Sequence, residues 1–185
     1  RGQAMQAALA GIGLPGMDTR DAALKLRHAT SLGGDVHGPE RLTRLVADLL
    51  GMPVRLVEFI GHWMEIPAHL QTRIGQAHTV LGQSAVAGRR SFQRQDRAEL
   101  RIGPLTLADY RRLLDDSDLR ARLRHAIRFA MGHEIDFDLR LVLARAEVPD
   151  PTIGPCQLGR TTWVAPTRRK DADDLRLPRF TDPAK

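Results

Sequence analysis

The stretch from Ile135 to Leu143 constrains the fold of this chain most, because apolar and polar side chains alternate along it. Every odd-numbered position carries an apolar residue, and the first three even-numbered positions carry charge: Asp136, Asp138 and Arg140. Side chains two positions apart lie on the same face of a β-strand. We therefore predict a strand with one face on a hydrophobic core and the other face polar or in contact with a partner.

Residues 39–50 give the clearest helix prediction. Pro39 suits the first helical turn, where a backbone N–H would have no helical partner in any case. Apolar residues then recur at helical spacing, at Leu42, Leu45, Val46, Leu49 and Leu50. Gly51 can adopt the left-handed conformation that ends a helix, and Pro53 prevents its continuation.

Two further helices are predicted in the second half of the chain. Thr106 is a suitable N-cap for the first, with Asp109 three positions on. Asp116 or Ser117 begins the second, and Gly132 ends it. The apolar face of this second helix consists of Leu119, Leu123, Ala126, Ile127 and Ala130.

Strands are predicted in three other places. Residues 54–60 are rich in β-formers, and a last short strand is expected over residues 161–164. Residues 89–94 are expected to pair with residues 98–103 as a hairpin. The glycine-spaced residues 61–88 indicate an irregular segment with short strands.

The predicted class is α+β: a helical N-terminal third followed by mixed short strands and helices. Helical patterns over residues 1–11 and 18–33 precede the helix at 39–50. The chain then divides into a helical segment (1–52), a mixed α+β core (53–164) and a polar, proline-punctuated tail (165–185). Because the chain begins with an arginine, we expect that part of the N-terminal region is missing.

The charge of the chain narrows the range of partners. Among its 185 residues the formal net charge is +6, and lysine occurs only at Lys25, Lys170 and Lys185. An arginine-rich surface indicates nucleic acid, an anionic membrane or an acidic protein as partner, although a codon preference for arginine explains it equally well. No apolar run approaches the ~20 residues that span a bilayer, so no direct membrane insertion is expected. The single Cys156 cannot form an internal disulfide, in agreement with a reducing cytoplasm.

The acidic residues near the predicted strand were considered as a catalytic or metal site. Asp136 and Asp138 point the same way from a strand and follow His133 and Glu134, so they could hold a hard cation or act as an acid–base pair. A solvated strand face paired with an arginine from a neighbouring element is the preferred interpretation. No HExxH, CxxC, GxSxG or P-loop pattern is present. We therefore predict a protein without a catalytic site, cofactor or metal.

Nucleic acid is the alternative partner. Positive charge beside an aromatic ring can track phosphates and stack a base. The residues that suggest this are the arginines around Phe92 (Arg89, Arg90, Arg94 and Arg97) and those of one predicted helix (Arg122, Arg124 and Arg128). The sequence contains no recognised nucleic-acid-binding motif, so a solvated or protein-facing surface is preferred. Trp63 is equally consistent with an interface anchor and with core packing. For Trp163 packing on the core is favoured.

An ordered series of motifs from Phe59 to Val164 resembles the TssG family (also called ImpH or VasB), baseplate subunits of the type VI secretion system. A Phe-x-Gly-x-Trp step begins at Phe59, and a Gly-Pro-Leu step begins at Gly103. A Gly-x-Glu-x-Asp-Phe-Asp step begins at Gly132, and a Leu-Gly-x-Thr-x-Trp step ends at Trp163. The chain departs from the family pattern at His78, Gln93, Arg160 and over residues 113–117.

The resemblance implies a structural function. The chain would be a cytoplasmic wedge component of the baseplate, joined to TssF and TssE, with a second TssF copy left open. It would dock TssK trimers that link the baseplate to the inner-membrane complex. The expected task is to hold partners at fixed angles, without catalysis and without nucleic acid.

Three sets of residues are the candidate site residues of such a scaffold. Glycines expected at turns or close backbone approaches are Gly61, Gly75, Gly82, Gly88, Gly103, Gly132 and Gly159. Within the segment of residues 53–164, the candidate interface residues are Trp63, Arg89, Arg90, Arg94, Asp136 and Asp138. In the tail, Leu175, Leu177 and Phe180 form a candidate docking segment for a partner, with a disordered end as the alternative.

Overall fold

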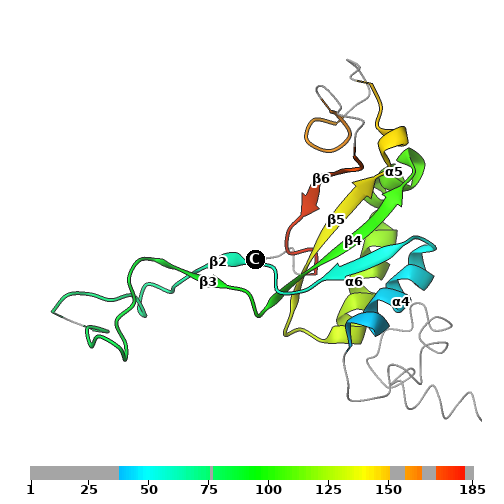
Figure 1. Ribbon diagram of the computed structural model, residues 1–185. Coiled ribbons are helices and arrows are strands. Elements are labelled where there is room, and N and C mark those ends of the chain that lie inside the picture. The colour runs from blue at the N-terminus through cyan, green and yellow to red at the C-terminus, as the bar shows by residue number, and fades with distance from the viewer. Residues whose placement is uncertain (1–37, 76, 151–156, 164–169, 182–185) are drawn as a thin grey trace, which may run out of the picture.

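The computed structural model describes residues 38–75, 77–150, 157–163 and 170–181. These residues form a body, in which one sheet carries helices on one face, and an arm that extends away from it (Figure 1). The helices predicted within residues 1–37 lie outside the described residues, as does Cys156.

The body contains a four-stranded sheet in the order β1-β4-β5-β6. Its strands are β1 (Val54–Val57), β4 (Arg97–Leu105), β5 (Asp136–Leu143) and β6 (Ala172–Leu177). The central pair, β4 and β5, is parallel, whereas β1 and β6 pair antiparallel with their neighbours at the two edges. A parallel pair needs a crossover connection, and two helices supply it here.

The three helices begin and end where local chemistry predicts. Helix α4 (Pro39–Leu50) ends at Gly51, which has φ 69°. Helix α5 (Leu107–Asp115) begins after Thr106, whose hydroxyl accepts a hydrogen bond from the backbone N–H of Asp109 at 3.2 Å. Helix α6 (Ser117–Met131) begins after Asp116, whose carboxylate accepts from the N–H of Leu119 at 2.9 Å. All three helix predictions are confirmed.

The core lies between this helical layer and the sheet. The predicted apolar face of α6 is buried along its whole length. Phe137, Leu139, Leu141 and Leu143 of β5 are at most 1% exposed, which confirms the strand predicted from their alternation. The short 3₁₀ helix η1 (Arg145–Glu147) follows β5 at the surface.

Gly103 allows two strands of the sheet to approach closely. It has φ 136°, and a Cβ at this position would lie 2.3 Å from the carbonyl oxygen of Val142. The register of β4 and β5 shifts between Ile102 and Leu105 for the same reason: glycine leaves room for an irregularity there.

Tyr110 joins α5 to the residues that follow η1. Its hydroxyl donates to the carbonyl oxygen of Arg160 at 3.0 Å, and its ring centroid lies 6.0 Å from that of Trp163. Trp163 packs partly buried against the core, as expected. Burial of the phenol, and then the negative charge of Asp174, raise the pKa of Tyr110 to about 12.

The predicted hairpin of residues 89–94 with 98–103 is wrong. Strand β3 (Arg90–Gln93) pairs with β2 (His62–Glu65), and β4 pairs with β1 and β5 instead. The reason lies in burial: Ala98, Leu100 and Ile102 face the helices, so β4 belongs in the middle of the sheet.

The C-terminal region also differs from the prediction. Within the described part of residues 161–164, Thr161 lies in a turn and Thr162 and Trp163 in coil, so the expected strand is absent there. The expected tail contains β6, which pairs antiparallel with β5. The structure is thus a mixed α/β fold compatible with the α+β class, and α4 is the helix that it describes in the N-terminal third.

Candidate partner-binding arm

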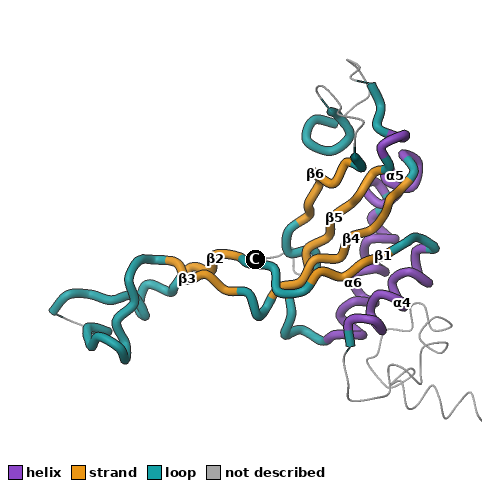
Figure 2. Tube along the Cα trace, viewed as in Figure 1, coloured by secondary structure: helices purple, strands orange, loops and turns teal. Residues whose placement is uncertain are grey.

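Residues 58–96, which we call the arm, leave the sheet between β1 and β4. Strands β2 and β3 form a two-stranded antiparallel ribbon in which His62 pairs with Gln93 and Glu65 with Arg90. Figure 2 shows this ribbon extending from the body and continuing into a long excursion of turns between the two strands. The arm therefore presents both of its faces at a distance from the core.

Large apolar side chains are exposed mainly on the arm. Nine of the ten exposed large hydrophobic residues of the described chain lie there: Phe59, Trp63, Met64, Leu70, Ile74, Val80, Leu81, Val86 and Phe92. The most exposed are Ile74 at 98% and Leu81 at 91%, both toward the far part of the arm. Contiguous exposed apolar surface marks protein–protein contact sites. The arm is the feature of the molecule best suited to contact another protein.

Aromatic packing shapes the ribbon near the body. The rings of Trp63 and Phe92 lie edge to face, with centroids 5.4 Å apart and an interplanar angle of 63°. Trp63 is nevertheless 63% exposed and Phe92 52% exposed, so the pair presents an aromatic surface to solvent. Trp63 therefore occupies a position from which it can anchor an interface.

The three arm arginines singled out from the sequence lie in β3 or next to its ends, close to Phe92 in the chain. Arg89, Arg90 and Arg94 are all exposed. Arg90 lies 3.5 Å from the carboxylate of Glu65, and Arg94 Nε donates to the carbonyl oxygen of Phe59 at 3.3 Å. The arm thus combines an apolar surface with a basic border.

The predicted turn glycines are spread over the arm and the body. Six of the seven have positive φ, between 71° and 136°: Gly75, Gly82, Gly88, Gly103, Gly132 and Gly159. Gly61 has no such φ, and its role is steric, since it lies against the ring of Phe92. Gly75, Gly82 and Gly88 lie in the turns of the arm, where left-handed backbone is needed.

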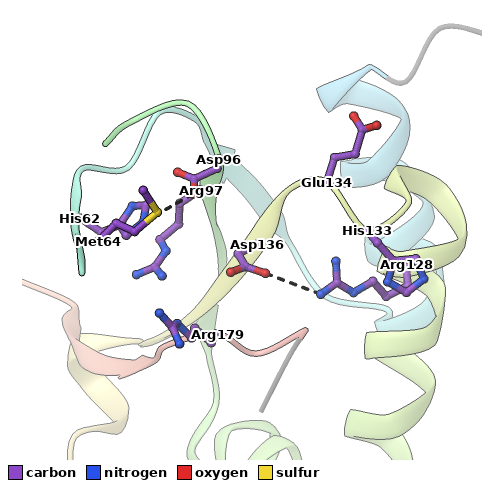
Figure 3. Close-up of a pocket in the computed structure, with 9 residues that line it drawn as sticks. All are labelled: His62, Met64, Asp96, Arg97, Arg128, His133, Glu134, Asp136 and Arg179. Carbon is purple, nitrogen blue, oxygen red and sulfur yellow. Dashed lines mark ion pairs between the residues drawn. The ribbon is translucent and has the colours of Figure 1, made fainter. Parts of the chain in front are cut away.

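A polar cavity of about 460 Å³ lies where the arm joins the body (Figure 3). His62 of β2 lies 3.6 Å from Asp96 on one side of it, and Arg128 of α6 lies 3.6 Å from Asp136 on the other. His62 Nδ1, Asp96 Oδ1 and Arg97 Nε are buried without a hydrogen-bond partner in the described chain. Such atoms are normally completed by water or by an incoming polar group. Polar side chains from both the arm and the body therefore line this cavity.

Asp136 and Asp138 project from the same face of β5, but arginines occupy both. Asp136 is paired with Arg128. Asp138 is fully buried, forms an ion pair with Arg176 of β6 and accepts from the N–H of Arg179 at 2.7 Å. The arginine pairing agrees with the interpretation preferred from the sequence, but the expected solvated face is wrong at Asp138, which is buried.

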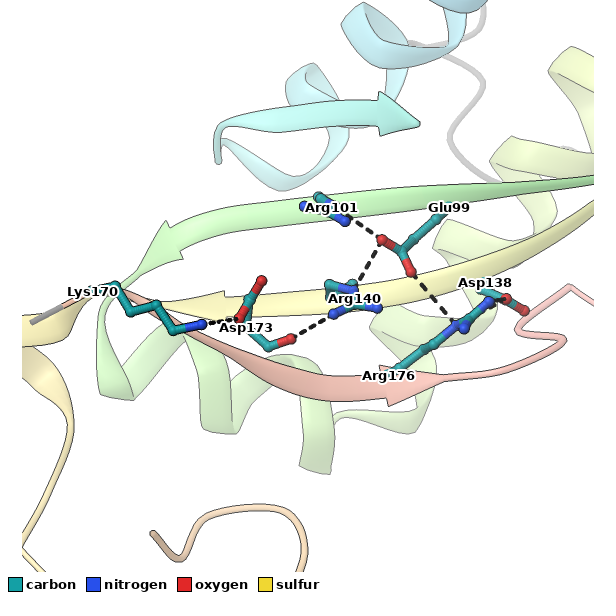
Figure 4. A network of polar contacts seen from close by, with 7 residues as sticks. All are labelled: Glu99, Arg101, Asp138, Arg140, Lys170, Asp173 and Arg176. Atoms are coloured by element: carbon teal, nitrogen blue, oxygen red, sulfur yellow. Dashed lines mark hydrogen bonds and ion pairs between the residues drawn. The ribbon is translucent and has the colours of Figure 1, made fainter. Parts of the chain in front are cut away.

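A buried carboxylate that sequence reasoning missed lies beside Asp138. Glu99 of β4 is 1% exposed, and three arginines from three strands surround it (Figure 4). Its carboxylate lies 2.8 Å from Arg101 Nε, 2.9 Å from Arg140 Nε and 3.5 Å from Arg176 Nε. In the sequence, the one sign of this buried ion-pair cluster is Arg101, which lies two positions after Glu99 and so on the same face of the strand.

The expected docking segment is part of the body in this structure. Leu175 and Leu177 of β6 pack partly buried against the core, opposite Leu141 and Leu139 of β5. Phe180 is 5% exposed, and the guanidinium of Arg124 lies 5.3 Å from its ring centroid. These apolar side chains therefore stabilise the sheet of their own chain.

Neither a metal site nor a membrane-spanning helix is found in the described part of the chain. The described residues contain no group of three or more His, Cys, Asp or Glu side chains arranged to hold a metal ion. None of the helices in the described part of the chain has the length and apolar character needed to cross a bilayer. The arm remains the principal candidate site.

The chain thus has a mixed α/β body and a projecting ribbon with exposed apolar side chains. This combination is typical of a structural protein that binds other proteins. The family model described as "Type VI secretion, TssG" matches residues 1–165, so the chain belongs to the TssG family of type VI secretion proteins. The family resemblance drawn from the sequence is thereby confirmed.

Two solved structures share the fold. A chain in the TssK-TssF-TssG baseplate subcomplex of the type VI secretion system, determined by cryo-electron microscopy, has a TM-score of 0.66 and 21% identity, over 95% of this chain and 78% of that chain. A chain in the baseplate complex of the type VI secretion system has a TM-score of 0.62 and 22% identity, over 94% of this chain and 51% of that chain. No curated protein matches the chain.

Proposed function

We propose that this chain is a structural subunit of the type VI secretion baseplate and that the arm is the element by which it holds a neighbouring subunit. The exposed apolar side chains of the arm carry this proposal. Surface of this kind is costly in water unless another protein covers it, and interfaces are enriched in aromatic residues and arginine. Because the chain belongs to the TssG family, we propose that the arm makes this contact within the type VI secretion baseplate.

The partners follow from the related assemblies. One of the similar structures is of a complex that contains TssK and TssF, and we propose the same two partners for this chain. TssE and a second copy of TssF follow from the family resemblance alone. The assembly would lie in the cytoplasm, with the baseplate docked at the inner-membrane complex.

The proposed role is non-catalytic. The one acid pair considered for acid–base or metal chemistry, Asp136 and Asp138, is engaged by Arg128 and Arg176. Nucleic acid, the alternative partner, has less support, because nine large aliphatic and aromatic side chains are exposed on the arm. Binding to nucleic acid is one of the outcomes of the experiments below.

The first experiment is co-expression of the full chain with TssF, TssE and TssK from the same source, followed by measurement of the complex mass. We expect a stable heteromeric complex. A variant in which Asn-Gly replaces residues 61–94 should keep the cooperative unfolding of the body and lose at least one partner. Retention of every partner by this variant would exclude the arm as the docking element.

Point variants then locate the contact on the arm. Trp63→Ala and Leu81→Ala should each weaken partner binding, by about tenfold or more if they are hot spots. Leu158→Ala is the matched control, because Leu158 is 87% exposed and lies off the arm. Equal binding by all three variants would contradict the proposal. Tight binding of the isolated chain to DNA, falling steeply with salt, would instead favour the nucleic-acid alternative.

A further inference from the structure

Four arginines lie in one row across the whole sheet, on the face opposite the helices. In the strand register Arg55 of β1 is paired with Arg101 of β4, Arg101 with Arg140 of β5, and Arg140 with Arg176 of β6. Residues directly opposite each other on neighbouring strands share a face of the sheet. We call these four residues the arginine row.

Stability alone does not explain this row. Like charges directly opposite each other on neighbouring strands are destabilising. Two carboxylates, Glu99 and Asp138, lie beside the row and offset part of the repulsion through their ion pairs with Arg101, Arg140 and Arg176. Four guanidinium groups over two carboxylates still leave an excess of positive charge on this face.

The excess charge is presented to solvent. Glu99 and Asp138 are at most 1% exposed, whereas the side chains of Arg101, Arg176 and Arg140 are 37%, 35% and 22% exposed. Arg55 is exposed at the edge of the sheet. These two carboxylates are therefore hidden beneath the guanidinium groups, and Asp136, a more exposed acid of β5 on this face, is paired with Arg128. A partner on the row would meet positive charge.

The buried contacts also hold the guanidinium groups in place. Arg101 Nε donates to Glu99 at 2.8 Å, and Arg140 Nη1 donates to the carbonyl oxygen of Asp173 at 2.9 Å. These bonds leave other N–H groups of the two side chains for a further partner, since a guanidinium has five. A planar guanidinium fixed in advance loses less conformational entropy when it binds.

The face that carries the row has no helical layer in the described part of the chain. Helices α4, α5 and α6 lie on the opposite face (Figure 1). Two of the three strand pairs are antiparallel, and sheets with antiparallel pairs can leave one face open. Another protein can therefore pack on this face.

We propose that the arginine row binds an α-helix of a partner protein that carries acidic residues on one face. Neighbouring strands are about 4.8 Å apart, so the row spans roughly 14 Å. Residues three or four apart on a helix surface are about 5–6 Å apart, so acidic residues on successive turns match the arginine spacing when the helix crosses the strands. Arginine and carboxylate groups can then pair with two parallel hydrogen bonds. This surface is separate from the arm and does not depend on the baseplate role.

The probe is a pair of fluorescent helical peptides, one with glutamates at every i, i+3 or i+4, and i+7 position of one face and the other with glutamines there. Binding to the full chain is measured by fluorescence anisotropy at low and physiological salt. The glutamate peptide should bind at least about tenfold more tightly, with affinity falling as salt rises. Equal affinities for the two peptides would overturn the proposal.

Variants assign the binding to the row. Arg55→Glu should weaken binding of the glutamate peptide about tenfold, and Arg55→Gln should weaken it less. The matched control is Arg44→Glu on α4, a side chain that is 78% exposed on the helical side of the body. Equal losses in Arg55→Glu and Arg44→Glu would show that net charge, and not the row, is recognised. Tighter binding of duplex DNA than of the peptide, with the same dependence on Arg55, would assign the row to nucleic acid and overturn the proposal.

Discussion

The ring of Phe92 lies directly against Gly61, the residue just before the paired strand β2. A Cβ at Gly61 would stand 2.2 Å from Cζ of Phe92, far inside van der Waals contact. Glycine at this position therefore lets Phe92 pack across the ribbon and meet Trp63 edge to face. The Phe-x-Gly-x-Trp step of the sequence is thus explained by packing within the arm.

Gly61→Ala should destabilise the arm by about 1–3 kcal/mol, because the added methyl group displaces the Phe92 ring. Urea unfolding followed by the fluorescence of Trp63, in a Trp163→Phe background, measures this locally. The control is the same substitution in a Phe92→Ala background, where the clash is gone and the cost should vanish. An equal cost in both backgrounds would refute the steric explanation.

Glu99→Gln should lower the free energy of unfolding of the body by about 3 kcal/mol, because it leaves Arg101 and Arg140 without their buried counter-ion, while Arg176 keeps Asp138. Chemical denaturation with two independent probes measures the change. Glu40→Gln is the matched control, since Glu40 is 87% exposed and its pair with Arg44 lies on the surface. A loss no larger than that of the control would mean that Arg101 and Arg140 do not depend on Glu99.

Phe180→Ala should destabilise the body by about 3 kcal/mol, as expected for removal of a buried aromatic side chain. Phe59→Ala, at a position that is 63% exposed on the arm, should leave the stability of the body nearly unchanged. Thermal unfolding of the two variants tests this contrast. If Phe180→Ala weakened partner capture without any loss of stability, the segment would be a docking element after all.

Tyr110 should titrate with a pKa of about 12, against an ordinary value of 10.0. It is the single tyrosine of the chain, so the ultraviolet absorbance of tyrosinate reports it directly. Because the pKa is raised in the folded state, the associated stability is fully present below pH 10 and falls as the pH rises toward about 12. Tyr110→Phe should abolish this part of the loss of stability at alkaline pH. A pKa of Tyr110 near 10 would contradict the prediction.

Local signals predicted much of the fold. The caps Thr106 and Asp116, the left-handed Gly51 and the alternation of β5 each determine an element from its own residues, and each was found where expected. Strand pairing depends on residues far apart in the chain, and for this reason β4 was assigned to a hairpin with its neighbour instead of to β1 and β5.

The candidate site was harder to predict. Prolines on both sides of β6 suggested a tail, because the sequence does not show that Arg176 reaches Asp138. Glu99 carries no local sign that three strands will bring arginines to it. On the arm, Ile74 and Leu81 follow no period, so their exposure could not be inferred from spacing.

The arm can vary in length more easily than the body, because it is an insertion between two paired strands. Its two ends enter and leave at strands that are themselves paired, since Val57 lies opposite Glu99. The entropic cost of closing such an insertion grows only with the logarithm of its length, by about 0.6 kcal/mol for each doubling. Insertions and deletions between β1 and β4 can therefore accumulate while the sheet keeps its register. The distance over which the subunit reaches a neighbour can thus evolve separately from the stability of its core.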